Sequence, residues 1–77
     1  MEKVIHLEDS VYKICSEYPI LIDILKELGF TDITKPGMLN TMGRFMTLSK
    51  GSAIKEIRMD TIEKRLIEEG FRLERSH

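Results

Sequence analysis

The chain has 77 residues, enough for one small domain with a single hydrophobic core but not for a catalytic domain joined to a second one. Its 42% hydrophobic and 32% charged residues are typical of a globular domain and exclude intrinsic disorder as its native state. With a formal net charge of −1, the chain has no overall positive field to attract nucleic acid or an anionic membrane.

Cysteine occurs once, at Cys15, which excludes an intramolecular disulfide and a metal site built from several cysteines of one chain. No apolar run approaches the roughly 18 residues that a membrane-spanning helix needs. The start of the sequence also lacks the apolar segment of a secretion signal. We therefore expect a cytoplasmic protein that does not enter the membrane.

The first elements are predicted by short apolar patterns. Residues 4–7 (VIHL) are apolar and partly β-branched, which favours a short extended segment. A helix is expected next, because one helical stripe carries four apolar side chains: Val11, Ile14, Cys15 and Tyr18. Asp9 or Ser10 can serve as its N-cap, and Pro19 should end it, since the residue before a proline avoids the α conformation.

Pro19 also suits the first turn of a following helix, which the segment PILIDILKELGF predicts from Pro19 to Gly29. This segment is apolar on nearly every side, so we expect it to be the central helix of the domain. Gly29 predicts the end of the helix in a left-handed conformation, with Phe30 folding back onto the last turn.

Residues 35–51 (KPGMLNTMGRFMTLSKG) are unusually rich in glycine and methionine. Pro36 favours a helix start, and Met38, Met42 and Met46 recur at i, i+4 and i+8, so a short amphipathic helix is predicted over about 36–46. Gly43 is expected to permit close helix packing. Thr47 can cap a weaker helical turn that follows it.

A last helix is predicted to begin with a capping box formed by Asp60 and Glu63. Its buried side is expected to contain three residues: Ile62, Leu66 and Ile67. Gly70 and Phe71 should close it in the same way as Gly29 and Phe30 close the earlier helix. The pattern as a whole predicts a single small helical domain over residues 1–77.

The methionine stripe has two interpretations. Methionine is flexible and polarizable, so it fills cores and also forms adaptable binding grooves, and its thioether can ligate haem iron. At helical spacing in a small domain, we expect Met38, Met42 and Met46 to belong to the core. An exposed methionine-rich groove is the alternative.

Arg44, with Asn40 and Thr41 one turn earlier, forms the best local candidate for a functional surface. Such a polar face can hold a carboxylate or a phosphate. The alternatives are a solvated face and an internal salt bridge, for instance between Arg44 and Asp32.

No catalytic or metal-binding constellation can be assembled from this sequence. His6 and His77 are the only histidines, and nothing brings them together with further ligands. Cys15 lies on an apolar stripe, where a buried and inert thiol is expected. We therefore expect no enzyme activity, no metal and no cofactor.

Nucleic-acid binding has little support. The basic residues near the carboxyl end are interleaved with acidic ones: Arg58, Lys64, Arg65, Arg72 and Arg75. A recognition helix needs a clear basic face and phosphate-binding flanks.

Three segments of the chain resemble a known family as a set: SVYKICSEYPILIDILKELGF, MLNTMGRFMTLSKGSAI and MDTIEKRLIEEGF. They resemble the small domain of unknown function at the amino terminus of ScdA-type iron-sulfur-cluster repair proteins, especially its stand-alone bacterial branch. The resemblance covers about residues 4–73. It implies an all-α fold, a compact orthogonal array of four to five short helices, here with a short extended N-terminal segment.

In some members of this family, a Cys-x-x-Cys redox motif follows the Gly-Phe pair that corresponds to Gly29 and Phe30. Asp32 and Lys35 occupy the matching places here, so this chain cannot carry out disulfide chemistry there. Other relatives are fused or adjacent to PAS and hemerythrin-like sensor modules, which implies a docking or regulatory role.

Our leading hypothesis is therefore a non-catalytic bacterial interaction or regulatory domain that binds a redox or signalling protein through Asn40, Thr41 and Arg44. A small-ligand or haem-binding module is the second hypothesis, and a nucleic-acid-binding domain is the third.

Overall fold

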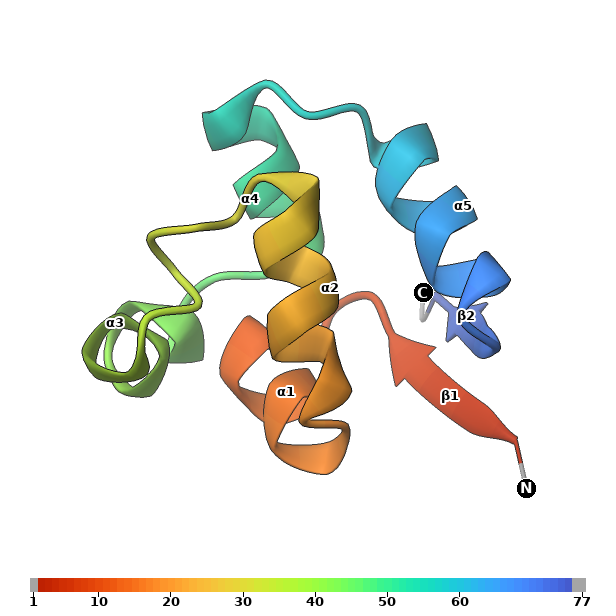
Figure 1. The fold of residues 1–77 in the computed structure, drawn as a ribbon, viewed down its shortest axis with the longest axis horizontal. Helices are drawn as coiled ribbons and strands as arrows, with labels where there is room; N and C mark the ends of the chain where they lie inside the picture. The colour runs from red at the N-terminus through yellow and green to blue at the C-terminus, as the bar shows by residue number, and fades with distance from the viewer. Residues whose placement is uncertain (1, 76–77) are drawn as a thin grey trace.

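The computed structural model describes residues 2–75, and within them the chain forms five α-helices, one 3-10 helix (η1) and two short strands. In chain order the elements are β1 (Lys3–His6), α1 (Val11–Glu17), α2 (Ile20–Leu28), α3 (Pro36–Asn40), η1 (Met42–Arg44), α4 (Leu48–Lys55), α5 (Met59–Glu68) and β2 (Phe71–Glu74). Figure 1 shows α2 at the centre, with α3 on one side of it and the two strands on the other. No helix in this range is long and apolar enough to cross a membrane.

The two strands form a parallel sheet, so the predicted all-α fold is wrong and the domain is a mixed α/β structure. The register pairs Lys3 with Phe71 and Ile5 with Leu73. An extended segment does lie near the amino end, but it is a paired strand. In β2, the side chain of Phe71 is buried and that of Arg72 is exposed, the alternation expected of a strand. The partner strands lie at opposite ends of the sequence, so no local pattern could reveal their pairing.

One hydrophobic core joins all the layers of the domain. Its buried members are Ile5, Leu7, Val11, Ile14, Cys15, Leu21, Ile24, Leu25, Phe30, Ile33, Leu48, Ile62, Leu66 and Phe71. The helices α1 and α2 contribute three members each, and α2 lies at the centre of the domain, as predicted (Figure 1). The strands contribute Ile5 and Phe71, so the sheet is part of the core and does not merely flank the helices.

Two predicted N-caps are confirmed. Ser10 precedes α1, and its Oγ accepts a hydrogen bond of 3.0 Å from the backbone N–H of Lys13. Thr47 precedes α4, and its Oγ1 accepts one of 3.2 Å from the N–H of Lys50. Each bond satisfies a backbone donor that the first helical turn leaves unpaired.

The end of α2 is also as predicted. Gly29 has a φ of +120°, and the N–H of Phe30 donates to the carbonyl of Leu25 at 2.9 Å. Phe30 is buried, and Gly51 of α4 faces its ring: a Cβ placed on Gly51 would lie 2.5 Å from Cε1 of Phe30. Glycine normally weakens the interior of a helix. The role of Gly51 in the structure is to let α4 approach the Phe30 ring.

The start of α5 differs from the prediction. The helix begins at Met59, and Arg58 at the N-cap position makes no side-chain capping bond. Asp60 lies within the first turn and forms a 3.3 Å ion pair with Arg58, so the predicted capping box is wrong. Ile67 was expected on the buried side but is exposed, because α5 buries a narrower stripe centred on Ile62 and Leu66.

Candidate interaction surface

The predicted helix over 36–46 is divided into two short pieces, α3 and η1. Thr41 lies at the break, with φ −108° and ψ −79°. Its hydroxyl donates to the carbonyl oxygen of Gly37 at 2.9 Å. A side chain that bonds to the carbonyl one turn earlier competes with the helical hydrogen bonds, which is consistent with a break at this residue.

One face of this segment packs onto the domain through Leu39, Gly43 and Met46. A Cβ on Gly43 would lie 3.1 Å from Cδ1 of Leu39 and 3.5 Å from the backbone nitrogen of Tyr12. The expectation that Gly43 permits close packing is therefore confirmed. The backbone N–H of Val11 also donates to the carbonyl of Met46 at 2.7 Å, which ties the segment to the start of α1.

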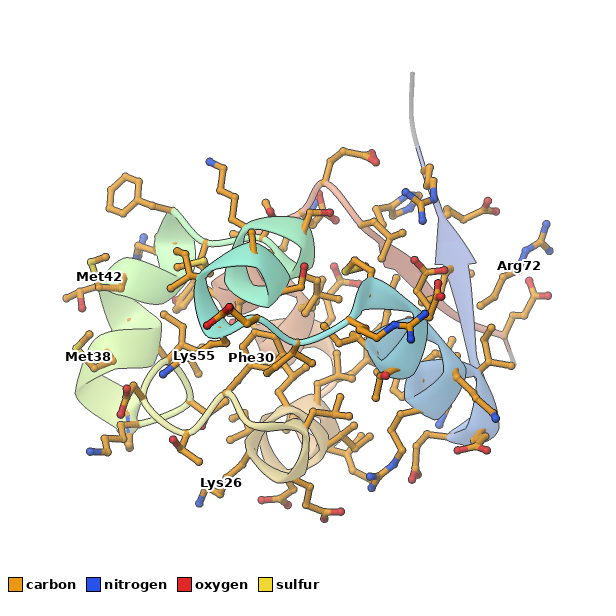
Figure 2. All side chains as sticks on the ribbon, turned by 90° about the horizontal axis from the view of Figure 1, so that it is seen from above. Lys26, Phe30, Met38, Met42, Lys55 and Arg72 are labelled. Carbon is orange, nitrogen blue, oxygen red and sulfur yellow. The ribbon has the colours of Figure 1, made fainter. Side chains whose placement is uncertain are left out.

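A second apolar stripe, Met38, Met42 and Phe45, faces away from the core. These side chains are 40%, 47% and 75% exposed. Figure 2 shows Met38 and Met42 at the outer edge of the molecule, at the end opposite Arg72. The prediction that Met38 and Met42 belong to the core is wrong, whereas Met46 does pack against it. The two stripes are offset by one residue, and the stripe with Gly43 is the one that can approach α1 closely.

The three polar residues predicted as a functional face lie beside this stripe and are exposed. The Nε of Arg44 donates to the carbonyl oxygen of Asn40 at 2.8 Å, and the guanidinium carbon lies 4.4 Å from the ring centroid of Tyr12. Within residues 2–75, Arg44 forms no ion pair with a carboxylate. The salt bridge considered between Arg44 and Asp32 is absent, because Asp32 pairs with Lys55 at 3.0 Å.

We call the exposed residues of this region the α3–η1 surface: Met38, Asn40, Thr41, Met42, Arg44 and Phe45. Two contacts hold the Arg44 side chain in place while its terminal nitrogens keep no protein partner among the described residues. An arginine held in this way is available to a carboxylate or phosphate of another molecule.

The charge distribution around this surface is a signal that the sequence analysis missed. Residues 33–55 contain four basic residues and no acidic one. Their basic members are Lys35, Arg44, Lys50 and Lys55. The hydrogen bond from Lys55, with the charges of Lys55 and Lys35, lowers the pKa of Asp32, the acidic residue just before this run. Counting charges along the segment could have identified it.

A shallow hollow lies between α2 and α5. Its lining residues are Leu28, Thr61, Lys64, Arg65 and Glu68. Arg65 is already engaged by Glu27 at 2.8 Å and by Glu69 at 3.1 Å. None of the methionines proposed as haem ligands lines this hollow. His6 is exposed on β1, and His77 lies outside the described residues. Among residues 2–75, no group of three or more His, Cys, Asp or Glu side chains could hold a metal ion.

Cys15 is buried in the core, as predicted, and burial raises the pKa of its thiol from 9.0 to about 11. Between these values the unfolded chain has lost the thiol proton while the folded chain keeps it. Unfolding then releases a proton, so the free energy of unfolding should fall as the pH rises from about 9 to about 11. Urea unfolding should show a steeper loss for the wild type than for Cys15→Ala across this window. If the unfolding free energies of the two proteins fall in parallel with pH, the raised pKa of the Cys15 thiol is contradicted.

The sequence pattern of the family described as "Domain of unknown function (DUF1858)" matches residues 5–62. The chain belongs to this family. The DUF1858 match includes the whole α3–η1 surface and ends within α5.

The DUF1858 domain described here is also similar to a solved structure, "The crystal structure of the conserved domain protein from Streptococcus pneumoniae TIGR4". The two are 32% identical, the TM-score is 0.90, and the match covers 96% of this chain and 94% of that chain. The two proteins thus share their fold over nearly their full lengths. No curated protein sequence matches the chain significantly. The family description names no activity, so a function has to be argued from the surface.

Proposed function

We propose that this DUF1858 domain is a non-catalytic bacterial interaction or regulatory module that docks onto a protein partner through the α3–η1 surface. The observation that carries the proposal is the exposed stripe of Met38, Met42 and Phe45 beside an arginine without a carboxylate partner among the described residues. Single exposed apolar residues are common on protein surfaces, but three that lie together along one short segment, from α3 to the end of η1, favour an interaction site.

The residue types in this surface suit a protein partner. Methionine adapts its shape to the surface it meets, and a phenylalanine can fill a pocket on a partner. Arginine is enriched among the residues that dominate binding energy at interfaces. Because Asn40 and Tyr12 already hold the side chain of Arg44, less conformational freedom is lost when it binds.

The class of partner follows from the resemblance given above. Similarity to the amino-terminal domain of ScdA-type iron-sulfur-cluster repair proteins, and to relatives near PAS and hemerythrin-like modules, supports a cytoplasmic redox or sensor protein. Because similarity and neighbourhood name no single protein, the partner is sought in a whole lysate.

Arg44→Glu should abolish capture of the partner from a lysate of the source organism without unfolding the domain. The change reverses one exposed charge and removes the Tyr12 and Asn40 contacts, so it should lower the free energy of unfolding by about 1–2 kcal/mol, less than the stability of the domain. Lys64→Glu on α5 is the matched control, because it makes the same charge change at an exposed residue outside the α3–η1 surface. Quantitative mass spectrometry of proteins retained by the tagged wild type and both variants is the measurement.

A protein retained by the wild type and by Lys64→Glu, but lost with Arg44→Glu, is the expected result. A partner that Lys64→Glu loses and Arg44→Glu keeps would place the site at the hollow between α2 and α5. Equal capture by all three proteins would contradict docking through Arg44, and failure of all three to retain any protein would contradict the interaction function.

A further inference from the structure

We infer that the partner presents an acidic amphipathic helix to the α3–η1 surface, with apolar side chains against Met38, Met42 and Phe45 and carboxylates facing Arg44 and Lys35. The inference rests on the proposed function and specifies the chemistry of the partner. It follows from the charge of residues 33–55, the spacing of the exposed apolar residues and the short length of α3 and η1.

The charge of the segment selects an acidic partner. The four basic residues of 33–55 are accompanied by no acidic residue, whereas all 13 acidic residues of the chain lie outside this run. Lys55 forms an ion pair with Asp32, but Arg44, Lys35 and Lys50 form none with the described carboxylates. A partner carboxylate therefore meets positive charge here without displacing an existing salt bridge. Such complementarity speeds association and disfavours basic partners.

The apolar residues match the repeat of a helix. Met38, Met42 and Phe45 follow one another at i, i+4 and i+7, and all three are exposed. A partner helix laid along α3 and η1 presents its own apolar side chains at the same spacing, over about two turns. Met38 and Met42 are about half covered by their neighbours, so they form the flat part of the surface and can adapt to the shape of a partner. Phe45 is more exposed and can insert into a pocket on the partner.

A membrane surface fits these observations less well. Helices that lie on membranes combine a long apolar face with many basic residues, whereas α3 and η1 together span only residues 36–44.

The test is a selection of random peptides of about 16 residues, long enough to form a helix, on the immobilised wild-type chain. Two variants then measure surface dependence: Arg44→Glu, and a double variant with Met42→Gln and Phe45→Gln. The altered side chains are exposed, so both variants should remain folded. Lys64→Glu is the control outside the surface. Affinities of the enriched peptides are measured by fluorescence anisotropy at low and high salt.

The expected peptides carry net negative charge and apolar residues at i, i+3 or i+4 and i+7. Both surface variants should bind them about tenfold or more weakly, Lys64→Glu should bind them unchanged, and added salt should weaken binding. Surface-dependent peptides without an acidic bias would overturn this inference and leave the proposed function standing. If no enriched peptide depends on the α3–η1 surface, both are overturned.

Two further outcomes distinguish other occupants. One is that no peptide binds and the wild type, but neither surface variant, co-sediments with phosphatidylserine vesicles. That result would identify a membrane as the occupant of the α3–η1 surface. The other is that the wild type forms concentration-dependent dimers that both surface variants abolish, again without peptide binding. That result would identify a second copy of this chain as the occupant of the α3–η1 surface. Each result would overturn the acidic-helix partner.

Discussion

Replacing Phe71 by alanine is expected to lower the free energy of unfolding by about 3–5 kcal/mol, the usual cost of deleting a buried aromatic side chain. The ring is buried between the sheet and the helices and meets Tyr18 edge to face, with centroids 5.3 Å apart. The ammonium group of Lys3 on the paired strand lies 4.5 Å from the same ring. A domain of this size is stable by only about 5 kcal/mol, so much of the variant should be unfolded.

Circular dichroism during urea unfolding measures this effect. Phe71→Leu keeps most of the apolar area and should remain folded with intermediate stability. Arg72→Ala is the control on the same strand, because that side chain is exposed and forms surface ion pairs with Glu2 and Glu74. Its cost should be below about 1 kcal/mol. Similar losses for Phe71→Ala and Arg72→Ala would show that burial of the ring does not hold the sheet in place.

Replacing Gly51 by valine should destabilise the domain by about 3 kcal/mol, although glycine is normally a poor helix residue. The added Cβ would lie 2.5 Å from Cε1 of Phe30, whose ring is buried in the core. Either α4 must move outward or the ring must leave its preferred conformation. Both responses reduce the packing of the core.

Gly37→Val is the matched control for this prediction. Nothing lies within 4 Å of a Cβ on Gly37, which is also a helical glycine, so the stability of that variant should change by no more than about 0.5 kcal/mol. The double variant Gly51→Val with Phe30→Leu should lose less unfolding free energy than the sum of the losses of the two single variants, by about 1 kcal/mol. Additive losses would indicate that the valine acts through something other than the Phe30 ring.

Helix positions and several helix ends could be predicted because their causes are local. Ser10 and Thr47 cap the helices that follow them, and Gly29 ends α2, each through contacts with residues at most five positions away. The capping box at Asp60 failed because the spacing of an aspartate and a glutamate also occurs inside a first helical turn, where Arg58 engages Asp60.

The sheet and the candidate surface depend on contacts that are distant in sequence. The pairing of Lys3 with Phe71 joins the two ends of the described chain. For α3 and η1, two apolar stripes one residue apart were both compatible with a buried helix. The stripe with Gly43 is the buried one because a glycine lets the segment approach the backbone of Tyr12 closely. The spacing of apolar residues in the sequence does not reveal such a tertiary contact.

The parallel pairing of β1 with β2 has a consequence for synthesis on the ribosome. β1 is made first, but its partner strand is made only after all five α-helices. At about 5–20 residues per second, β1 waits roughly 3–13 s for β2, whereas contacts between neighbouring helices form in milliseconds or less. During that wait the nascent chain carries a strand with unpaired backbone groups next to partly packed helices. During synthesis the sheet can therefore close only after β2 has been made, and until then β1 is exposed to pairing with strands of other chains.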